Sequence, residues 1–167
     1  MAAAAHHSGA DIFLHVQTKR AGKVKGESTT AGHVDDIVLT GWNWGLSAGS
    51  ALGNTQATGR RSYTALTVCK HIDQATTALM AALATNDEVK EAKLTMRRAG
   101  GSQEDYFLIT LKAARITSVQ HDAVSDGGTQ EVVTLAFTEV EVEYRPQRSG
   151  GGRGGSFMFT DTLPTNG

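Results

Sequence analysis

The chain has 167 residues, of which 40% are hydrophobic and 20% are charged. This length and composition are typical of one globular domain and exclude disorder along the whole chain. The net charge is −1, so the chain lacks the basic surplus with which nucleic-acid-binding domains contact phosphates. No apolar run reaches the roughly 18 residues of a membrane-spanning helix, and we expect neither a nucleic-acid partner nor membrane insertion.

The chain contains 19 glycines, 2 prolines and one cysteine, Cys69. A single cysteine excludes an internal disulfide, and scarce proline suits paired strands because proline cannot donate to a β-ladder. Residues 1–10 are rich in alanine and lack the segments of a cleaved signal peptide. We expect them to be a disordered or added extension, residues 11–160 to form one domain, and residues 161–167 to be a flexible tail.

The first two strands are predicted at residues 12–16 and 37–47. The second alternates large apolar side chains with polar Asn43 and Ser47, and its apolar face changes sides near Gly41, which predicts a bend. The apolar side chains, expected in the core rather than on a ligand-stacking platform, are Trp42, Trp44 and Leu46.

Residues 49–61 are predicted to form a loop, because this stretch has no hydrophobic periodicity. A loop of about a dozen residues in a compact domain is usually functional. Its glycines and the arginine pair at its end are Gly49, Gly53, Gly59, Arg60 and Arg61. One hypothesis is therefore a monomeric β-barrel binding module that uses this loop.

One helix is predicted, at residues 75–83, after a strand at residues 63–72. Its apolar residues recur at helical spacing and are Ala75, Leu79, Ala82 and Leu83. Asp73 or Thr76 is the expected cap of its first turn.

Three longer strands are predicted at residues 90–98, 106–119 and 131–144, with glycine turns between them. The apolar positions of the last one slip by one residue between Phe137 and Val140, which predicts a bulge. Its residues expected beside the tryptophans are Val133, Leu135 and Phe137. After a glycine-rich connector, a short strand is predicted at residues 157–159. The whole pattern indicates an antiparallel barrel or sandwich with one helix.

Two small clusters have the residue types of chemical sites. Cys69 and His71 lie two residues apart on one predicted strand, as a thiol nucleophile and its base would, but no third orienting group is visible. His33, Asp35 and Asp36 could ligate a metal, although paired carboxylates before a strand more often belong to a turn. A cysteine-dependent hydrolase is therefore another hypothesis. Because both clusters have a more ordinary explanation, we expect no catalytic residue, no metal and no cofactor.

The last long strand carries an acidic stripe of Glu139, Glu141 and Glu143 on one face. Like charges on one face repel each other, so the stripe either faces solvent or pairs with cations. By parity the basic partners are Lys93 and Arg97, on a neighbouring strand or on another subunit.

Four segments carry a resemblance to a known family through their order in the chain. They are Lys25-Gly26-Glu27-Ser28, Gly41-Trp42-Asn43-Trp44-Gly45, Lys90-Glu91-Ala92-Lys93-Leu94-Thr95-Met96-Arg97-Arg98-Ala99-Gly100-Gly101 and Val142-Glu143-Tyr144-Arg145-Pro146-Gln147. Together they resemble the haemolysin-coregulated protein (Hcp) family of the bacterial type VI secretion system, over residues 11–147. The alanine-rich start and the ending after residue 147 are unlike the family.

The resemblance implies a mainly β fold, an antiparallel β-barrel of two sheets with one flanking α-helix, related to phage tail-tube subunits. It implies a structural subunit of the secretion tube that assembles into homohexameric rings, which stack into a hollow conduit. The implied partners are a tip spike protein, a contractile sheath and effector proteins carried as cargo. The protein would reside in the bacterial cytoplasm before firing and then be secreted, extracellularly or into target cells, without a cleaved signal peptide.

Two groups of residues acquire expected roles in such a ring. If the tryptophans point into the core, Asn43 and Ser47 lie on the opposite face of their strand, and we expect them to line the lumen. The loop at residues 49–61 is expected to leave its own barrel and contact a neighbouring subunit or the next ring.

Overall fold

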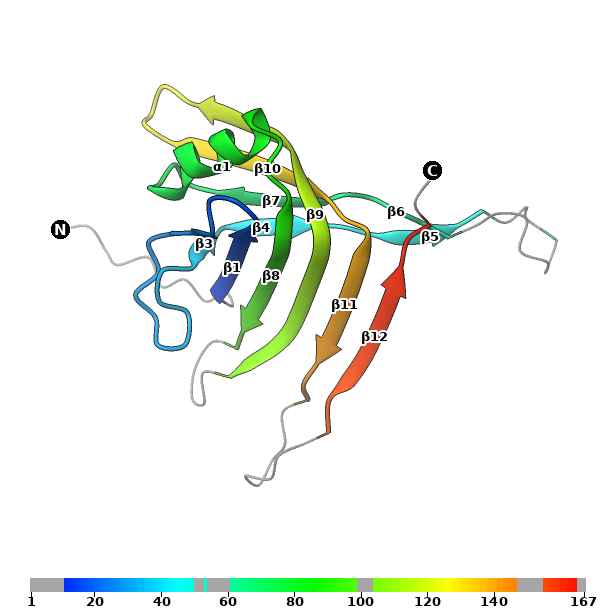
Figure 1. Ribbon diagram of the computed structural model, residues 1–167. Helices are drawn as coiled ribbons and strands as arrows, with labels where there is room; N and C mark the ends of the chain where they lie inside the picture. The colour runs from blue at the N-terminus through cyan, green and yellow to red at the C-terminus, as the bar shows by residue number, and fades with distance from the viewer. Residues whose placement is uncertain (1–10, 50–52, 54–60, 99–103, 147–154, 165–167) are drawn as a thin grey trace.

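The computed structural model describes residues 11–49, 53, 61–98, 104–146 and 155–164. Within these ranges the chain forms twelve strands and one helix (Figure 1). The strands before the helix are β1 (Asp11–Thr18), β2 (Lys23–Val24), β3 (Ile37–Leu39), β4 (Gly41–Asn43), β5 (Leu46–Ala48), β6 (Arg61–Tyr63) and β7 (Leu66–Lys70). They are followed by α1 (Ala75–Ala84), β8 (Val89–Arg97), β9 (Asp105–Ala123), β10 (Thr129–Ala136), β11 (Glu139–Tyr144) and β12 (Phe157–Thr162).

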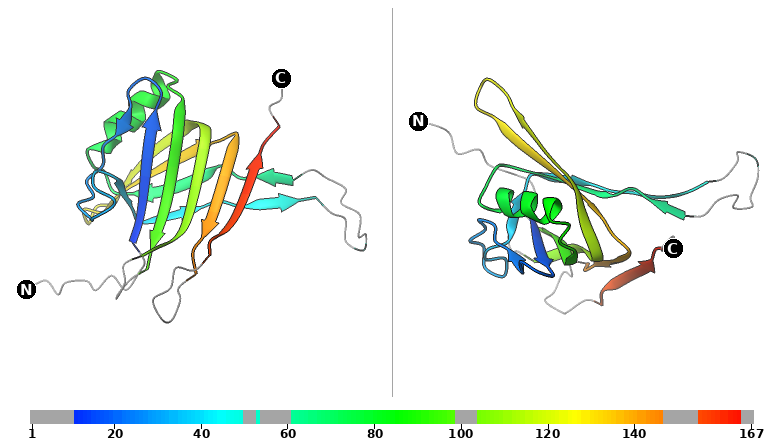
Figure 2. Two further views of the ribbon diagram at one scale, coloured as in Figure 1. Left: turned by 60° about the horizontal axis from the view of Figure 1, so that its bottom comes forward. Right: turned by 45° about the horizontal axis from the view of Figure 1, so that its top comes forward.

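Ten of these strands form one antiparallel sheet that curls upon itself. Its larger part holds β1, β2, β3, β8, β11 and β12, its smaller part holds β4, β7 and β10, and β9 runs through both. β3 pairs with β1 and β4 pairs with β7, although only Thr40 separates β3 from β4. The Thr40 N–H donates to the Cys69 carbonyl oxygen at 2.8 Å, so hydrogen bonding continues across this junction. The predicted fold class, mainly β with antiparallel strands and one flanking helix, is confirmed for the described residues, and the two predicted sheets are the larger and smaller parts of one continuous sheet (Figure 2).

β9 has 19 residues and bends where it passes from the larger to the smaller part of the sheet. Its first half pairs with β11 and its second half with β10. At the bend Ala113 has a φ of 48°, in a region that non-glycine residues rarely adopt. The partner strand is interrupted opposite the bend, at Phe137 and Thr138. The predicted slip between Phe137 and Val140 is therefore confirmed, since both strands must bend together.

α1 is the predicted helix, and its N-terminus is held by acidic side chains. The Ala75 N–H donates to Asp73 Oδ1 at 2.9 Å, and the Gln74 N–H donates to Glu27 Oε1 at 3.0 Å. Ala75, Leu79 and Ala82 are buried in the core, whereas Leu83 is exposed, contrary to expectation. α1 has ten residues, so no helix of the described residues is long enough to cross a membrane.

The predicted strand at residues 37–47 is in fact three strands, β3, β4 and β5. β5 pairs with β6 in a two-stranded extension, which we call the arm, that projects away from the barrel (Figure 2). Leu46 lies on this arm and is 48% exposed, so its expected place in the core is wrong. The alternation of apolar and polar residues continues to Leu46, but the chain has left the barrel before this residue.

The two tryptophans do pack against the core, as predicted. The Trp44 ring stacks on Tyr63 with 5.7 Å between centroids and meets Phe137 edge-on at 6.3 Å. Trp42 stacks on Phe107 at 6.0 Å. Both indoles are half-buried, because they lie at the rim of the barrel where the arm begins.

Some predicted boundaries shift. Arg61 belongs to β6 and not to the loop, and β12 continues to Thr162, two residues beyond the expected end of the domain. Residues 1–10, most of the loop at residues 49–61 and residues 165–167 lie outside the described residues.

Replacing Trp44 with Ala should lower the free energy of unfolding by about 3 kcal/mol, because the variant loses the stacking on Tyr63 and leaves a void beside Phe137. Leu46→Ala is the matched control, since Leu46 has the same parity but is exposed, and its effect should stay within about 0.5 kcal/mol. Urea denaturation of both variants measures this. Equal effects would mean that Trp44 contributes no more to the core than Leu46.

Candidate functional site

Sequence reasoning missed a buried ion pair beneath α1. Lys70 and Glu131 are 1% and 0% exposed, and the Lys70 Nζ lies 3.0 Å from Glu131 Oε1. The Lys70 Nζ also lies 2.8 Å from Asp73 Oδ1. The Thr76 hydroxyl donates to Glu131 Oε2 at 2.6 Å, and His121 Nε2 lies 3.2 Å from the same oxygen. These contacts tie β7, β9, β10 and the first turn of α1 together.

A signal for this pair was present in the alternation of the two strands. Lys70 has the parity of Leu66 and Val68, and Glu131 has the parity of Val133 and Leu135. Charges of opposite sign at two inward positions of neighbouring strands indicate a buried pair.

Burial alone would raise the pKa of the Glu131 carboxyl, because a charge is poorly solvated inside a protein. The hydrogen bonds from Thr76 and Lys70, together with the Lys70 charge, outweigh this effect and hold the pKa of Glu131 below its usual value. Glu131 is therefore ionised at neutral pH and keeps Lys70 compensated.

The cluster around His33 forms internal contacts and belongs to a turn. His33 stacks on Phe13 with centroids 4.3 Å apart, and its Nδ1 and Nε2 each lie 3.0 Å from a carboxylate oxygen, of Asp36 and Asp105 respectively. Asp35 has a φ of 65°, as expected of a turn residue. In the part of the chain that the structure describes, no three His, Cys, Asp or Glu side chains are grouped to hold a metal ion.

The thiol of Cys69 and the imidazole of His71 do not share a strand face, because β7 ends at Lys70. Cys69 is half-buried in β7, and His71 Nδ1 lies 3.2 Å from the Thr129 carbonyl oxygen. This geometry gives the hydrolase hypothesis no support.

The most unusual surface lies on β11 and β12, which we call the wing. These strands extend the larger sheet beyond the barrel, and β12 pairs with β11 and with no other described strand (Figure 1). Along β11 the inward face emerges from the core: Val140 is buried, whereas Tyr144 is 41% exposed. On β12, Phe157, Met158 and Phe159 are 68%, 55% and 45% exposed. The Tyr144 and Phe157 rings stack on each other at 6.5 Å.

Asp161 fastens the wing to the arm. Its carboxylate accepts hydrogen bonds from the Arg61 guanidinium, at 2.9 Å from the terminal nitrogen, and from the Tyr63 hydroxyl at 2.8 Å. These hydrogen bonds hold the pKa of Asp161 below its usual value, and the one from Arg61 has the largest effect. Arg61, which was expected to contact another subunit, thus has a partner within its own chain.

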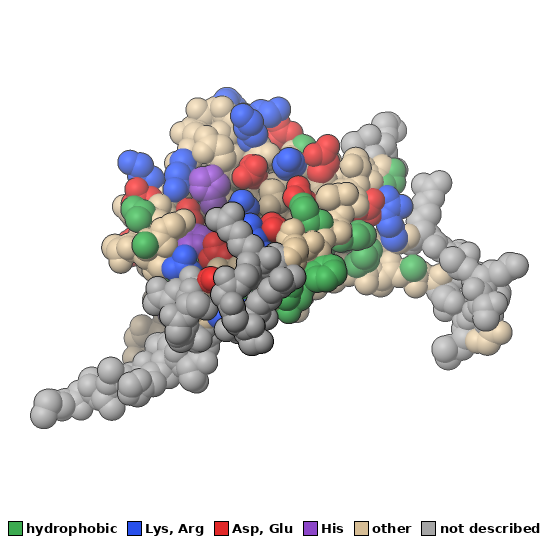
Figure 3. Space-filling model, turned by 90° about the horizontal axis from the view of Figure 1, so that it is seen from below, with side chains coloured by type: hydrophobic (Ala, Val, Ile, Leu, Met, Phe, Trp, Pro, Cys, Tyr) green, Lys and Arg blue, Asp and Glu red, His purple; other side chains and the backbone are tan. Residues whose placement is uncertain are grey.

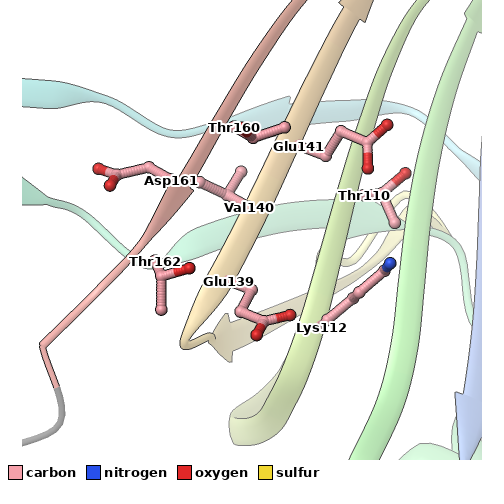
Figure 4. A pocket seen from close by; sticks show the side chains of 8 residues that line it. All are labelled: Thr110, Lys112, Glu139, Val140, Glu141, Thr160, Asp161 and Thr162. Carbon is pink, nitrogen blue, oxygen red and sulfur yellow. The ribbon is translucent and has the colours of Figure 1, made fainter.

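The face of the larger sheet that points away from the core is polar and carries both signs of charge. One row across five strands is His15, Lys93, Thr110, Glu141 and Thr160, and the next is Gln17, Glu91, Lys112, Glu139 and Thr162. A shallow hollow of about 450 Å³ lies over the wing end of these rows, where Lys112 and Glu139 stand on adjacent strands (Figure 4). Figure 3 shows intermixed charges on this side next to a patch of hydrophobic side chains.

The acidic stripe therefore has cations on its own chain. Glu139 pairs in register with Lys112, and Glu143 binds the Arg145 Nε at 2.9 Å. Of the two expected partners, Lys93 lies in the same row as Glu141 with Thr110 between them, but Arg97 pairs with Asp105.

The proposed lumen residues are both exposed but do not share a strand. Asn43 ends β4 in the smaller part of the sheet, and Ser47 lies in the arm, where its Oγ is 3.3 Å from Ser62 Oγ. Of the predicted contact-loop residues, Gly49 and Gly53 are described, and Gly59 and Arg60 lie outside the described residues.

Comparison with known proteins identifies relatives of this architecture. Residues 13–144 match the family model described as type VI secretion system effector, Hcp. The chain is 36% identical to protein hcp1 of Pseudomonas aeruginosa over 154 residues, which cover 87% of this chain and 89% of that protein. It is 27% identical to the major exported protein of the same organism over 97 residues, 57% of this chain and 56% of that protein.

Solved structures show the same fold. The crystal structure of Hcp1 from Salmonella typhimurium has a TM-score of 0.76 at 25% identity, covering 93% of this chain and 95% of that one. A baseplate chain of the anti-feeding prophage shares the fold at 11% identity, with a TM-score of 0.51 and coverage of 85% of this chain and 97% of that one.

Replacing Glu131 with Gln should lower the free energy of unfolding at neutral pH by about 3 kcal/mol, because the buried Lys70 loses its fully buried counter-charge and is left with Asp73 alone. Because the folded pKa of Glu131 is depressed, its contribution is present above the ordinary glutamate pKa and is lost as the pH falls through the folded value. The deficit of the variant should therefore shrink on acidification. Urea unfolding at one fixed protein concentration, from neutral to acidic pH, measures both effects.

The matched control is Glu139→Gln, which removes an exposed carboxylate from the polar face and should change the free energy by less than about 0.5 kcal/mol. A Glu131→Gln deficit no larger than that of the control would contradict a stabilising role for the buried pair.

Proposed function

Because this chain belongs to the Hcp family of type VI secretion system proteins, we propose that it is a structural subunit of the secretion tube. Six chains join head to tail into a ring, and rings stack into a hollow conduit that carries effector proteins. In such a contact one surface of each subunit binds a different surface of the next, and the ring closes when the rotation between them permits. The chain needs no catalytic residue or cofactor for this role.

The apolar wing is the observation that carries the proposal. Tyr144, Phe157 and Phe159 lie on one face of two adjacent strands and are 41–68% exposed, and together they present roughly 300 Å² of apolar surface to water. An apolar patch of this size is often functional. β12 also has an edge that no described strand pairs, and such an edge invites pairing with another chain unless assembly covers it.

The polar face of the larger sheet is the best candidate for the channel wall. Its two rows hold both signs of charge close together, so the wall would present no strong field of one sign to a passing protein. The sequence-based candidates Asn43 and Ser47 lie elsewhere, on β4 and on the arm, and they remain an alternative for contact with cargo.

The other partners follow from membership of the family. We propose that the predicted loop at residues 49–61, which links β5 to β6 in the sequence, contacts the next ring. A tip spike protein and a contractile sheath are the proposed outer partners. The protein would act from the bacterial cytoplasm and leave the cell with the tube, without a cleaved signal peptide.

Phe157→Ser should abolish ring formation while leaving the subunit folded, because Phe157 is 68% exposed in the chain and can contribute little to its core. The matched control is Val124→Ser, at a 61% exposed apolar residue on the turn between β9 and β10. Light scattering should give the mass of six chains for the wild type and the control, and of one chain for Phe157→Ser. A wild type that stays monomeric at high concentration would instead favour a monomeric binding module.

The two candidate channel faces can be separated with bulky charges. Thr110→Arg, in the polar rows, should leave ring assembly intact and reduce the amount of effector that co-purifies with the rings, whereas Asn43→Arg should leave that amount unchanged. The reverse result would place Asn43 on the lumen and remove the polar face from it.

A further inference from the structure

The outer face of α1 carries no charge, which is unusual for a helix on a protein surface. A helix on the surface normally presents charged side chains to water, whereas a helix that is apolar all round is normally buried. In α1 none of the ten residues is charged. The exposed ones are Thr77, Ala78, Met80, Ala81, Leu83 and Ala84.

The exposed large apolar side chains of the described residues form two main groups. One is the wing. The other is at α1, where Met80 and Leu83 are 46% and 38% exposed and Ile72, just before the helix, is 52% exposed. The remaining ones, Val34, Val38, Leu46 and Val124, lie near charged groups or on the arm and a turn. α1 therefore provides an apolar surface that matches the wing in chemistry.

The positions of the two surfaces suit a head-to-tail contact. α1 lies against the barrel beside β9 and β10, and the wing forms the free edge of the larger sheet on another side of the barrel (Figures 1 and 2), so a chain does not cover its own wing with its own helix. A stable interface buries about 800 Å² on each partner, more than twice what the apolar side chains on this face of the wing supply. A helix of small residues lets the facing strand approach closely, so that backbone and rim atoms can provide the rest.

We propose that the wing of one subunit packs on the outer face of α1 of a second copy of this chain. This inference rests on the proposed ring and names the receiving surface within it. Phe157, Phe159 and Tyr144 supply the apolar anchors, and Met80, Ala81 and Leu83 supply the surface that they cover. The contact removes both uncharged surfaces from water and repeats identically around the ring.

The test is a cross-link between two cysteines in the full chain. In a Cys69→Ala background, Phe159→Cys on β12 is combined with Ala81→Cys on α1, and the protein is treated with a short bis-maleimide. Position 159 lies on the same face of β12 as Phe157, so its side chain points toward the proposed contact. The matched control combines Phe159→Cys with Ala123→Cys, since Ala123 is also an exposed alanine but lies on the hairpin of β9 and β10. Light scattering before treatment establishes whether rings are present.

We expect the 159/81 pair to give a ladder of linked chains up to six, with peptides of β12 joined to peptides of α1, and the control pair to remain mostly unlinked. Rings that form but link no better through the 159/81 pair than through the control pair would overturn the inference and leave the proposed ring standing. A chain that is monomeric by light scattering would overturn both. As an independent readout, Ala81→Glu should cause loss of the ring and Ala123→Glu should not.

Discussion

The bend of β9 is the constraint on which the architecture depends. A strand of 19 residues that pairs with β8 on one side and with β10 and β11 on the other holds both parts of the sheet together. Because β9 bends at Ala113, the strands beside it must bend or break, and the chain interrupts β10 and β11 at that level. The consequence is that β10 lies in the smaller part of the sheet, between β9 and β7, while β11 belongs to the larger part and pairs outward with β12.

The buried charges beneath α1 hold the helix against the barrel. A helix of ten uncharged residues has little intrinsic reason to stay on the barrel, since short helices are marginal without tertiary contacts. Leu79 and Ala82 provide apolar contacts, and the Thr76 hydroxyl joins the helix directly to Glu131. The pair of Lys70 and Glu131 therefore fixes the orientation and position of α1 on the sheet, and it contributes more to specificity than to net stability.

The charged and the exposed apolar side chains lie on different surfaces of the molecule. Charges of both signs are spread over one sheet face, while the large exposed apolar side chains concentrate on the wing and at α1. Asp161 joins the wing to the base of the arm through Arg61 and Tyr63, so the orientation of one constrains the other.

The sequence by itself determined the class of fold, the helix, most strands and the family, because these depend on local periodicity and on ordered short motifs. Alternation predicted that Val133, Leu135 and Phe137 face inward, and they are buried. Alternation could not say where the core ends, so Leu46 was placed inside although the chain had already left the barrel. It also left Lys70 and Glu131 unexplained, because a buried charge becomes intelligible only when its partner, 61 residues away, is known to be 3.0 Å distant. The wing shows most clearly what the sequence could not decide. Phe157 and Phe159 are residue types typical of a core strand, and only the tertiary structure shows that no part of the described chain covers them.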